Sequence, residues 1–479
     1  MILSDHKTKI VCTIGPSCSS EEIIRGLILR GMDIARLNFS HGELSHHSEI
    51  IYRIRKIATE MDKVIPILVD LPGPKIRIGK LLKEPLNLQQ GDTVTLTSST
   101  ELLDDSFIPV DFPKLAESVS PGSLVYINDG FLQLECLEVS GENVKCKVIV
   151  GGELTSHKGV NLPGSNVFLE PVTEKDIQLI DFALEGGLDC FSISFIESAH
   201  DLKKIREYVD SKGKKAFLVA KIERERAVKN IDSILLEADA IMVARGDLGV
   251  EIPIEDVPIV QKKIIHKANL LSIPVITATQ MLESMTYNIR PTRAEATDVA
   301  NAIIDGTDAV MLSGETAVGK YPLATVEMMA KIAKQTEKWR GTSKTGIYLM
   351  KKAMTKMQLQ IDDIISLQIN EALQQLPIKY VLVPTASGET CRRVSRFRPD
   401  TWIIGFSRYP HTCNVMAFQY GVHPIFVGGQ VTDWEQKAFE KLKQYAIYAP
   451  GELVIITQGQ TAGHGKQGGT NLLKFIRLE

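Results

Sequence analysis

Three charged residues in two short segments of the chain have types and spacing that could do chemistry. Lys221 and Glu223 lie in the segment AKIER, and Asp247 ends the segment VARGD, each at the end of an apolar run. Two carboxylates at the ends of neighbouring strands suit a hard divalent cation such as Mg²⁺, with Mn²⁺ as a substitute, because such ions need few protein ligands. Lys221 and Glu223 are two residues apart, so on an extended strand both side chains point to one side.

A lysine beside a bound metal ion stabilises developing negative charge, as phosphoryl transfer and enolate chemistry require. The alternative is a buried ion pair between Lys221 and Glu223 that only packs the mouth of the fold. The segment RGDLG, which contains Asp247, can also present backbone N–H groups to an anion. The sequence shows no histidine cluster of the kind that indicates zinc.

Polar side chains also follow the other apolar runs. A solvated loop charge or a helix cap explains each of them alone, but a polar group after nearly every run indicates a shared site. These further candidates are Arg36, Asn38, Ser40, Asp70, Arg245, Thr279, Glu283, Ser313 and Glu315.

Eight apolar, β-branched runs are the elements that could bring these residues together. Both faces of each run are apolar, which is typical of strands buried in a parallel sheet. Ser19, Thr173 and Thr292 each precede an acid by three residues, which predicts helix N-caps between the runs. Eight strands, most followed by a helix, predict a (β/α)8 TIM barrel, and a doubly wound open sheet is the second possibility. The runs are KIVCTI, DIARLNF, VIPILVD, CFSISFI, AFLVAKI, AIMVARGD, PVITATQ and AVMLSGE.

The series of runs is interrupted once and is followed by a third region. Between Lys75 and about Leu169 polar and apolar residues alternate, which predicts an inserted antiparallel β domain that caps the barrel as a lid. After about Arg340 apolar runs such as YVLVPT and TWIIGFS alternate with helical segments, which predicts a parallel α/β domain. We expect a catalytic barrel at residues 1–73 and 170–340, a small β-barrel lid domain at 74–169 and a regulatory α/β domain at 341–479.

The composition argues against several classes of protein. The chain has 479 residues and a formal net charge of −3, so neither a nucleic acid nor a membrane surface is an expected partner. It shows no signal peptide and no apolar run of membrane-spanning length, and its seven cysteines form no C-x-x-C pair, so we expect a cytoplasmic protein. The segment GHGKQ at 463–467 departs from a P-loop, so a bound nucleotide would need metal, Arg or Lys at its phosphates.

Eight motifs occur in order along nearly the whole chain: RLNFSHG (36–42), DLPGPKIR (70–77), HKGVNLPG (157–164), AKIE (220–223), MVARGDLG (242–249), TATQMLESM (277–285), RPTRAE (290–295) and MLSGETAVGKYP (311–322). They resemble the motifs of the pyruvate kinase family, including the inserted and C-terminal domains. The resemblance implies Mg²⁺-dependent transfer of the phosphoryl group of phosphoenolpyruvate to ADP, giving pyruvate and ATP in the last step of glycolysis. It also implies a homotetramer.

The resemblance assigns roles to the charged strand-end residues. Glu223 and Asp247 would ligate Mg²⁺. Lys221 would neutralise charge on the transferring phosphoryl group and on the enolate, and Arg36 would clamp the phosphoryl group. Positioning and charge neutralisation supply nearly all of the catalysis in such a transfer.

Further roles concern the substrate carboxylate and the nucleotide. The backbone N–H groups of Gly246 and Asp247 would hold the carboxylate together with the Thr279 hydroxyl, and the enolate would be protonated on the Thr279 side. The residues implied to contact ADP or ATP are Asn38, His41, Arg77 and, on the lid, Lys158.

One departure from the family pattern concerns a monovalent cation. Many members bind a required K⁺ through side chains that correspond here to Asn38, Ser40 and Asp70, and the Leu71 carbonyl could complete the set. Lys75, however, stands where those members have Glu, and an ammonium can supply the positive field of K⁺ while repelling a bound K⁺. We therefore predict that K⁺ is not required. The alternative is that Lys75 points to solvent.

A second departure lies in the C-terminal domain. The segment TASGET follows a strand and opens a helix, so its N–H and hydroxyl groups suit a phosphate, and it resembles the family's effector loop. Where members activated by fructose 1,6-bisphosphate carry Lys and Arg, this chain has Ala386 and Glu389. A sugar monophosphate or AMP is therefore the expected effector, with Arg392 and Arg393 either adding charge or lying in solvent. The expected effector residues are Thr385, Ser387, Gly388 and Thr390.

Two other functions stay open. A Mg²⁺-dependent enolate lyase or aldolase on a similar barrel would use the same Lys, Glu and Asp, although Arg77 and Lys158 argue against it. A regulatory binder without activity is the second, although the intact set of Lys221, Glu223, Asp247 and Thr279 argues against that.

Overall fold

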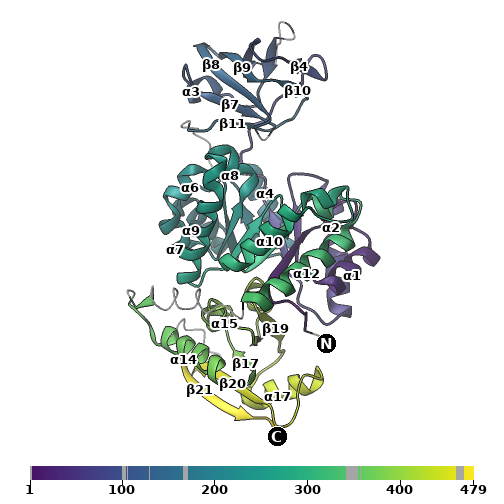
Figure 1. Ribbon diagram of the computed structural model, residues 1–479, viewed down its shortest axis with the longest axis vertical. Helices are drawn as coiled ribbons and strands as arrows, with labels where there is room; N and C mark the ends of the chain where they lie inside the picture. Colours follow the sequence, from purple (N-terminus) through teal and green to yellow (C-terminus); the bar gives the residue numbers. More distant parts are fainter. Residues whose placement is uncertain are drawn as a thin grey trace.

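A closed barrel of eight parallel strands forms the centre of the molecule (Figure 1). The computed structural model describes residues 3–99, 104, 106–128, 130–164, 171–340, 354–355, 358–459 and 469–479. The first strand pairs with both the second and the last, so the predicted barrel is confirmed and the open sheet is excluded. In order around the barrel the strands are β1 (Lys9–Thr13), β2 (Ile34–Asn38), β3 (Ile67–Asp70), β12 (Cys190–Ile193), β13 (Phe217–Ile222), β14 (Ala240–Ala244), β15 (Val275–Ala278) and β16 (Ala309–Leu312).

The barrel strands are apolar on both faces because each face meets a different core. In β1, Val11 belongs to the cluster inside the barrel, whereas Ile10 and Cys12 pack with the surrounding helices. Phe418 of the C-terminal domain joins the inner cluster, with its ring centroid 4.7 Å from that of Phe217. The C-terminal domain therefore closes the barrel at the end where β13 begins, and the opposite mouth carries the polar strand ends.

Helices surround the barrel strands. Thr173 and Thr292 form the predicted capping boxes, but the cap of the first helix is Ser20, whose side chain accepts from the Ile23 N–H, so the prediction of Ser19 is wrong by one residue. Within the described residues no helix is both long and apolar enough to cross a membrane. The helices are α1 (Glu21–Arg30), α2 (Leu44–Glu60), α4 (Glu174–Glu185), α5 (Ala199–Ser211), α6 (Glu225–Lys229), α7 (Ile231–Glu237), α8 (Arg245–Glu251), η1 (Ile254–Asp256), α9 (Val257–Leu270), η2 (Glu283–Thr286), α10 (Arg293–Asp305), α11 (Gly314–Ala317) and α12 (Pro322–Arg340).

The segment inserted after β3 forms a separate β structure with its own core, and Figure 1 shows it standing above the barrel on a narrow neck. A six-stranded sheet has the order β11-β7-β8-β9-β5-β6, and β4 pairs with β10. Buried and exposed residues alternate along β9, as predicted, but the β5–β6 pair is parallel rather than antiparallel. The elements are β4 (Leu86–Leu88), β5 (Thr93–Thr97), β6 (Phe107–Pro109), α3 (Leu115–Ser118), β7 (Leu124–Ile127), β8 (Leu132–Ser140), β9 (Asn143–Val150), β10 (Gly152–Leu154) and β11 (Val160–Asn161).

The C-terminal domain lies at the opposite end of the molecule (Figure 1). Its sheet has the order β19-β18-β17-β20-β21; the first four strands are parallel, as predicted, and β21 is an additional antiparallel strand. The expected boundaries at 169/170 and 340/341 and the segment GHGKQ fall wholly or partly outside the described residues. The elements are α14 (Ile361–Gln375), β17 (Ile378–Pro384), α15 (Glu389–Ser395), β18 (Trp402–Ser407), α16 (Pro410–Ala417), β19 (Val422–Phe426), α17 (Trp434–Gln444), β20 (Leu453–Gly459) and β21 (Thr470–Arg477).

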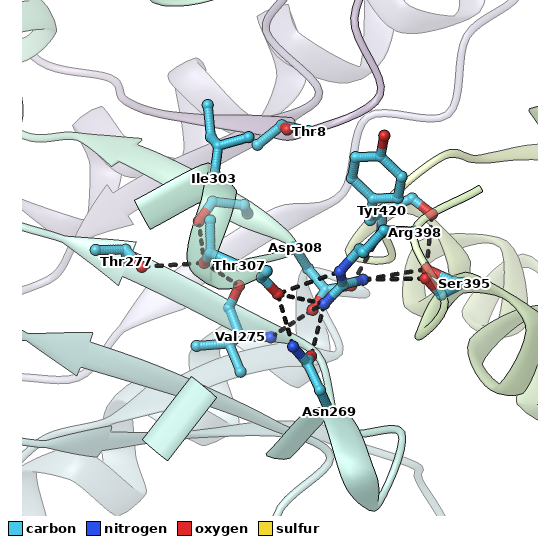
Figure 2. A network of polar contacts seen from close by, with 12 residues as sticks. Thr8, Asn269, Val275, Thr277, Ile303, Thr307, Asp308, Ser395, Arg398 and Tyr420 are labelled. Atoms are coloured by element: carbon cyan, nitrogen blue, oxygen red, sulfur yellow. Dashed lines mark hydrogen bonds and ion pairs between the residues drawn. The ribbon is translucent and has the colours of Figure 1, made fainter. Parts of the chain in front are cut away.

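A network centred on Arg398 fixes the C-terminal domain to the base of the barrel (Figure 2). The guanidinium lies 2.6 and 2.7 Å from the two carboxylate oxygens of Asp308 and donates to Asn269 Oδ1 at 2.6 Å. The side chains of Arg398 and Asp308 are only 9% and 4% exposed. Asp308 also accepts the N–H groups of Val275 and Tyr420. This one carboxylate, directly before β16, therefore bonds to β15 of the barrel and to the C-terminal domain.

We predict that Arg398→Met destabilises the protein by about 3–5 kcal/mol, because it leaves the buried Asp308 carboxylate without its ion-pair partner. Chemical denaturation of the full chain measures this loss. Arg25→Met is the control: Arg25 pairs with Glu60 on the surface, where such pairs contribute about 0–1 kcal/mol. Equal stability losses in the two variants would contradict the importance of the Arg398 network.

Candidate active site

Lys221 and Glu223, at the end of β13, form the centre of the polar barrel mouth. Lys221 Nζ lies 2.8 Å from Glu223 Oε1 and 2.8 Å from Ser194 Oγ, and 3.4 Å from Asp70 Oδ1. The Lys221 and Glu223 side chains are 12% and 1% exposed. Burial opposes the charged ammonium, but attraction by Asp70 and Glu223 outweighs it and holds the pKa of Lys221 above its usual value. The site therefore contains a fixed positive charge.

Arg36 and Asp70 extend this cluster across two further strands. Arg36 donates from Nε to Asp70 Oδ2 at 2.8 Å, and also from Nη2, while its Nη1 bonds to Thr13 Oγ1 at 2.8 Å. Ser192 donates to the other Asp70 oxygen at 2.8 Å. Burial favours the neutral form of Asp70, but Lys221 and Arg36 lower its pKa below the usual value. Two cations thus flank one ionised carboxylate at the ends of β2, β3 and β13.

The two predicted metal ligands differ in their surroundings. The remaining Glu223 oxygen accepts the Phe195 N–H at 2.8 Å. Burial and the nearby Asp247 raise the pKa of Glu223, although Lys221 acts in the opposite direction. Asp247, in the first turn of α8, has its Oδ1 3.4 Å from Lys75 Nζ. Because the carboxylates of Glu223 and Asp247 repel each other, a cation bound between them would stabilise their ionised forms.

The residues of the predicted monovalent-cation corner already bind protein groups. The Asn38 side-chain oxygen accepts the Ser40 N–H at 3.1 Å, and the Leu71 carbonyl accepts the Ser194 hydroxyl at 2.7 Å. The ammonium of Lys75 faces Asp247 rather than these oxygens, and its side chain is 29% exposed. Lys75 therefore does not simply point to solvent.

Thr279 and Gly246 meet between neighbouring strand ends. The Gly246 N–H donates to Thr279 Oγ1 at 2.8 Å, and this hydroxyl donates to the Ala278 carbonyl at 2.6 Å. Two of the groups predicted to hold a carboxylate thus lie within one hydrogen bond of each other.

The residues predicted to contact the nucleotide form two groups. Arg77 pairs with Gly159 in an antiparallel bridge, and the Ile78 N–H donates to the Lys158 carbonyl at 2.8 Å, so Arg77 and Lys158 lie together in the neck of the lid. Asn38 ends β2 and His41 follows it at the barrel mouth.

Comparison with known proteins agrees with this arrangement. Residues 5–326 match the model of the pyruvate kinase barrel domain, and residues 363–476 match that of the pyruvate kinase alpha/beta domain. The chain belongs to the pyruvate kinase family. It is 45% identical to the pyruvate kinase of Thermococcus litoralis, over 100% of both chains, and 39% identical to that of Mycobacterium tuberculosis, over 99% of this chain and 98% of the relative. The crystal structure of a pyruvate kinase from Cryptosporidium parvum superposes with a TM-score of 0.91 at 35% identity, covering 99% of this chain and 97% of that one. The protein is therefore a phosphotransferase.

The pyruvate kinase family normally uses Mg²⁺, and the donor set at the barrel mouth fits this ion. Among the described residues no group of three or more His, Cys, Asp and Glu side chains could hold a metal by itself. Mg²⁺ is commonly bound by only one or two carboxylates and completes its shell with water and substrate oxygens. Glu223 and Asp247 provide such a pair.

The sequence-based interpretation missed two hydroxyls of this pyruvate kinase site. Ser192 and Ser194, on and just after β12, are buried and bond to Asp70 and to Lys221 respectively. Their spacing of two within the apolar run CFSISFI was the available signal, because it places both side chains on one face of a strand.

Groups of the predicted effector loop already form hydrogen bonds with protein groups, both within the loop and with β21. The Gly388 N–H donates to Thr385 Oγ1 at 2.9 Å, and the hydroxyls of Thr390 and Thr470 bond to each other. Arg393 forms ion pairs with Glu389 and Asp363, so the expectation that it adds free charge or lies in solvent is wrong. This pairing depends on α14, which the loop sequence alone does not reveal.

Proposed function

We propose that this protein transfers the phosphoryl group of phosphoenolpyruvate to ADP, producing pyruvate and ATP in the presence of Mg²⁺ or Mn²⁺. The observation that carries the proposal is the ammonium of Lys221, fixed between the carboxylates of Asp70 and Glu223 with the guanidinium of Arg36 beside it. Such a preorganised pair of cations stabilises charge on a phosphoryl group in transfer without reorganising during the reaction.

The roles of the neighbouring groups follow from their positions. Glu223 and Asp247 would hold the metal ion, which when bound would supply positive charge that stabilises negative charge on the substrate. The Gly246 and Asp247 N–H groups, together with the Thr279 hydroxyl, bind the substrate carboxylate. The carboxylate then takes the place of Thr279 Oγ1 as the acceptor of the Gly246 N–H. The enolate is then protonated on the Thr279 side.

The nucleotide is bound from both sides of the space below the lid. Arg77 and Lys158 approach its phosphates from the neck, and Asn38 and His41 contact it from the barrel mouth. Arg77 is available for this because, among the described residues, its Nη1 bonds to the His157 carbonyl alone, at 3.0 Å, in an exposed position.

Dependence on ADP tests the proposal against a lyase or an aldolase. Purified protein is incubated with phosphoenolpyruvate and Mg²⁺, with and without ADP, and pyruvate is measured. Pyruvate and ATP in equal amounts, formed only with ADP and abolished by a chelator, are expected. Carbon–carbon cleavage without ADP would support the lyase instead.

We further propose that activity does not require K⁺. Asp70, Asn38 and Leu71 already accept hydrogen bonds from protein groups, and Lys75 adds a positive charge beside Asp247. When K⁺ is replaced by tetramethylammonium at constant ionic strength, we expect the rate to stay within about twofold of the rate measured with K⁺. The reason is that the Lys75 ammonium already supplies the positive electrostatic field that a bound K⁺ would supply, and it does so without a binding step. A loss of about tenfold or more would reject this prediction.

For the effector we propose a sugar monophosphate or AMP at Thr385, Ser387, Gly388 and Thr390, in a homotetramer that works in the cytoplasm. Arg393 is neutralised by Glu389 and Asp363, which leaves Arg392, whose buried Nε has no hydrogen-bond partner in the described part of the chain, as the arginine of this helix that can serve a single phosphate. The buried side-chain amide of Gln419 has no hydrogen-bond partner among the described residues, and it lies beside Gly388, with its Nε2 3.7 Å from the position that a Cβ on Gly388 would take.

Titration of candidate effectors against the phosphoenolpyruvate saturation curve should show larger activation by monophosphates. Strongest activation by fructose 1,6-bisphosphate would contradict this.

A further inference from the structure

Two consecutive residues at the mouth of the barrel adopt an unfavourable backbone conformation. Thr279 and Gln280, directly after β15, have φ angles of 67° and 52°. Left-handed values are uncommon outside glycine, and for a β-branched residue such as threonine they are a clear outlier. Conformations of this kind persist only where surrounding groups hold them, and they gather at functional sites.

Arg245, the first residue of α8, holds this turn from the neighbouring strand. Its Nη2 donates to the Thr279 carbonyl at 2.8 Å, and its Nε to the Ala278 carbonyl at 3.3 Å. Its Nη1 lies 2.7 Å from Asp298 Oδ1, on α10. The Arg245 side chain is 12% exposed. A planar guanidinium that bonds in three directions fixes the Ala278 and Thr279 carbonyls relative to α10.

These contacts also distinguish Arg245 from a substrate-binding cation. Each of its three nitrogens already bonds to a protein oxygen, and its charge is paired with Asp298. The cations assigned to the phosphoryl group are Arg36 on β2 and Lys221 on β13.

We propose that Arg245, anchored by Asp298, is a positioning residue that locks the left-handed Thr279–Gln280 turn and thereby fixes the Thr279 hydroxyl for the reaction. This role rests on the proposed function, because it acts through the part that Thr279 plays there. Without substrate, the Gly246 N–H also donates to Thr279 Oγ1; once the substrate carboxylate takes this N–H, the Arg245 clamp is what holds the turn. Arg245 itself does not touch the substrate.

Arg245→Met tests this role, with Gln280→Gly as the rescue. Losing the clamp lets Thr279 move, and displacement of about 1 Å at a reacting group can cost about 10²-fold, so kcat should fall by that order. Glycine at 280 adopts a positive φ at no steric cost, so the double variant should recover about tenfold of the loss. Exchange of pyruvate methyl hydrogens with deuterium, followed by proton NMR, should fall and recover in parallel.

Arg206→Met is the matched control. Arg206 donates to the Ala216 and Glu237 carbonyls at 3.4 and 3.0 Å and to Asp239 at 2.9 Å, so it makes the same kinds of contact where β13 and β14 begin. Its loss should leave kcat within about twofold of the wild type, because these contacts lie away from the reacting groups. A merely structural role for Arg245 predicts the same behaviour for both variants.

Two results overturn the inference: an Arg245→Met variant whose loss lies only in the KM for phosphoenolpyruvate, and a Gln280→Gly substitution that recovers none of the loss in kcat. If Arg245→Met does not fold, Asp298→Asn loosens the guanidinium without removing it, and an unchanged kcat there overturns the inference equally. A wild-type protein that forms no pyruvate contradicts the proposed function as well, whereas an active wild type with an equally active Arg245→Met contradicts this role alone.

Discussion

Lys221→Met is expected to lower kcat by about 10³-fold or more while the protein remains folded. Removal of one neutral donor from an oxyanion site costs about 10²–10³-fold, and a charged donor contributes more. In this protein Glu223, Ser194 and Asp70 hold the Lys221 ammonium in place. Another cation could replace its charge only if these side chains rearranged around it. Steady-state rates with saturating phosphoenolpyruvate, ADP and Mg²⁺ measure the effect.

Lys9→Met controls for the loss of a buried lysine. Lys9 begins β1 at the opposite end of the barrel, where its Nζ donates to the Val422 carbonyl at 2.8 Å and lies 3.7 Å from Asp33 Oδ1. Its substitution should reduce stability and leave kcat nearly unchanged. If Lys221→Met keeps kcat within about tenfold of the wild type, Lys221 is not the main charge stabiliser.

Glu223→Gln should weaken Mg²⁺ binding by about 100-fold or more, because even groups that only orient a metal ligand typically contribute about 10–100-fold. The amide keeps the shape of the carboxyl but removes its charge, and among the described residues it leaves Asp70 as the carboxylate paired with Lys221. Isothermal titration with Mg²⁺ measures the affinity directly, and the dependence of activity on Mg²⁺ concentration should shift by a similar factor.

The matched control for this variant is Glu337→Gln. Glu337 is also buried, and it accepts the N–H groups of Lys7 and Thr8 and the Thr8 hydroxyl. Its loss should destabilise the protein without changing the affinity for Mg²⁺. Unchanged affinity in Glu223→Gln would remove Glu223 from the metal site.

The barrel and the centre of its site could be predicted because they depend on local pattern. Runs such as AFLVAKI are apolar on both faces, which is typical of barrel strands, and the period of two places Lys221 and Glu223 on one side. The closeness of Lys221 to Glu223 follows from this period. The barrel brings Asp70 to the same mouth, because the ends of its parallel strands meet there.

Contacts that depend on packing between distant segments could not be predicted in the same way. The pairing of Lys75 with Asp247 depends on the course of the neck, and the clamp of Arg245 on Thr279 depends on the turn after β15. From the sequence, Arg393 is expected to be a cation on a helix with no ion-pair partner, because its partner Asp363 lies on α14, a distant segment. The strand β21 was missed because most of its residues are partly or fully exposed, which removes the pattern of a buried strand.

Phosphorus NMR of the complete protein with phosphoenolpyruvate, ADP and Mg²⁺ tests the central claim most directly, because it follows the transferred phosphorus itself. Loss of the phosphoenolpyruvate signal should be matched by growth of the γ-phosphate signal of ATP, in buffer without K⁺, and Lys221→Met should show almost none of this transfer. Release of inorganic phosphate in place of ATP, or equal transfer by Lys221→Met, would contradict the account.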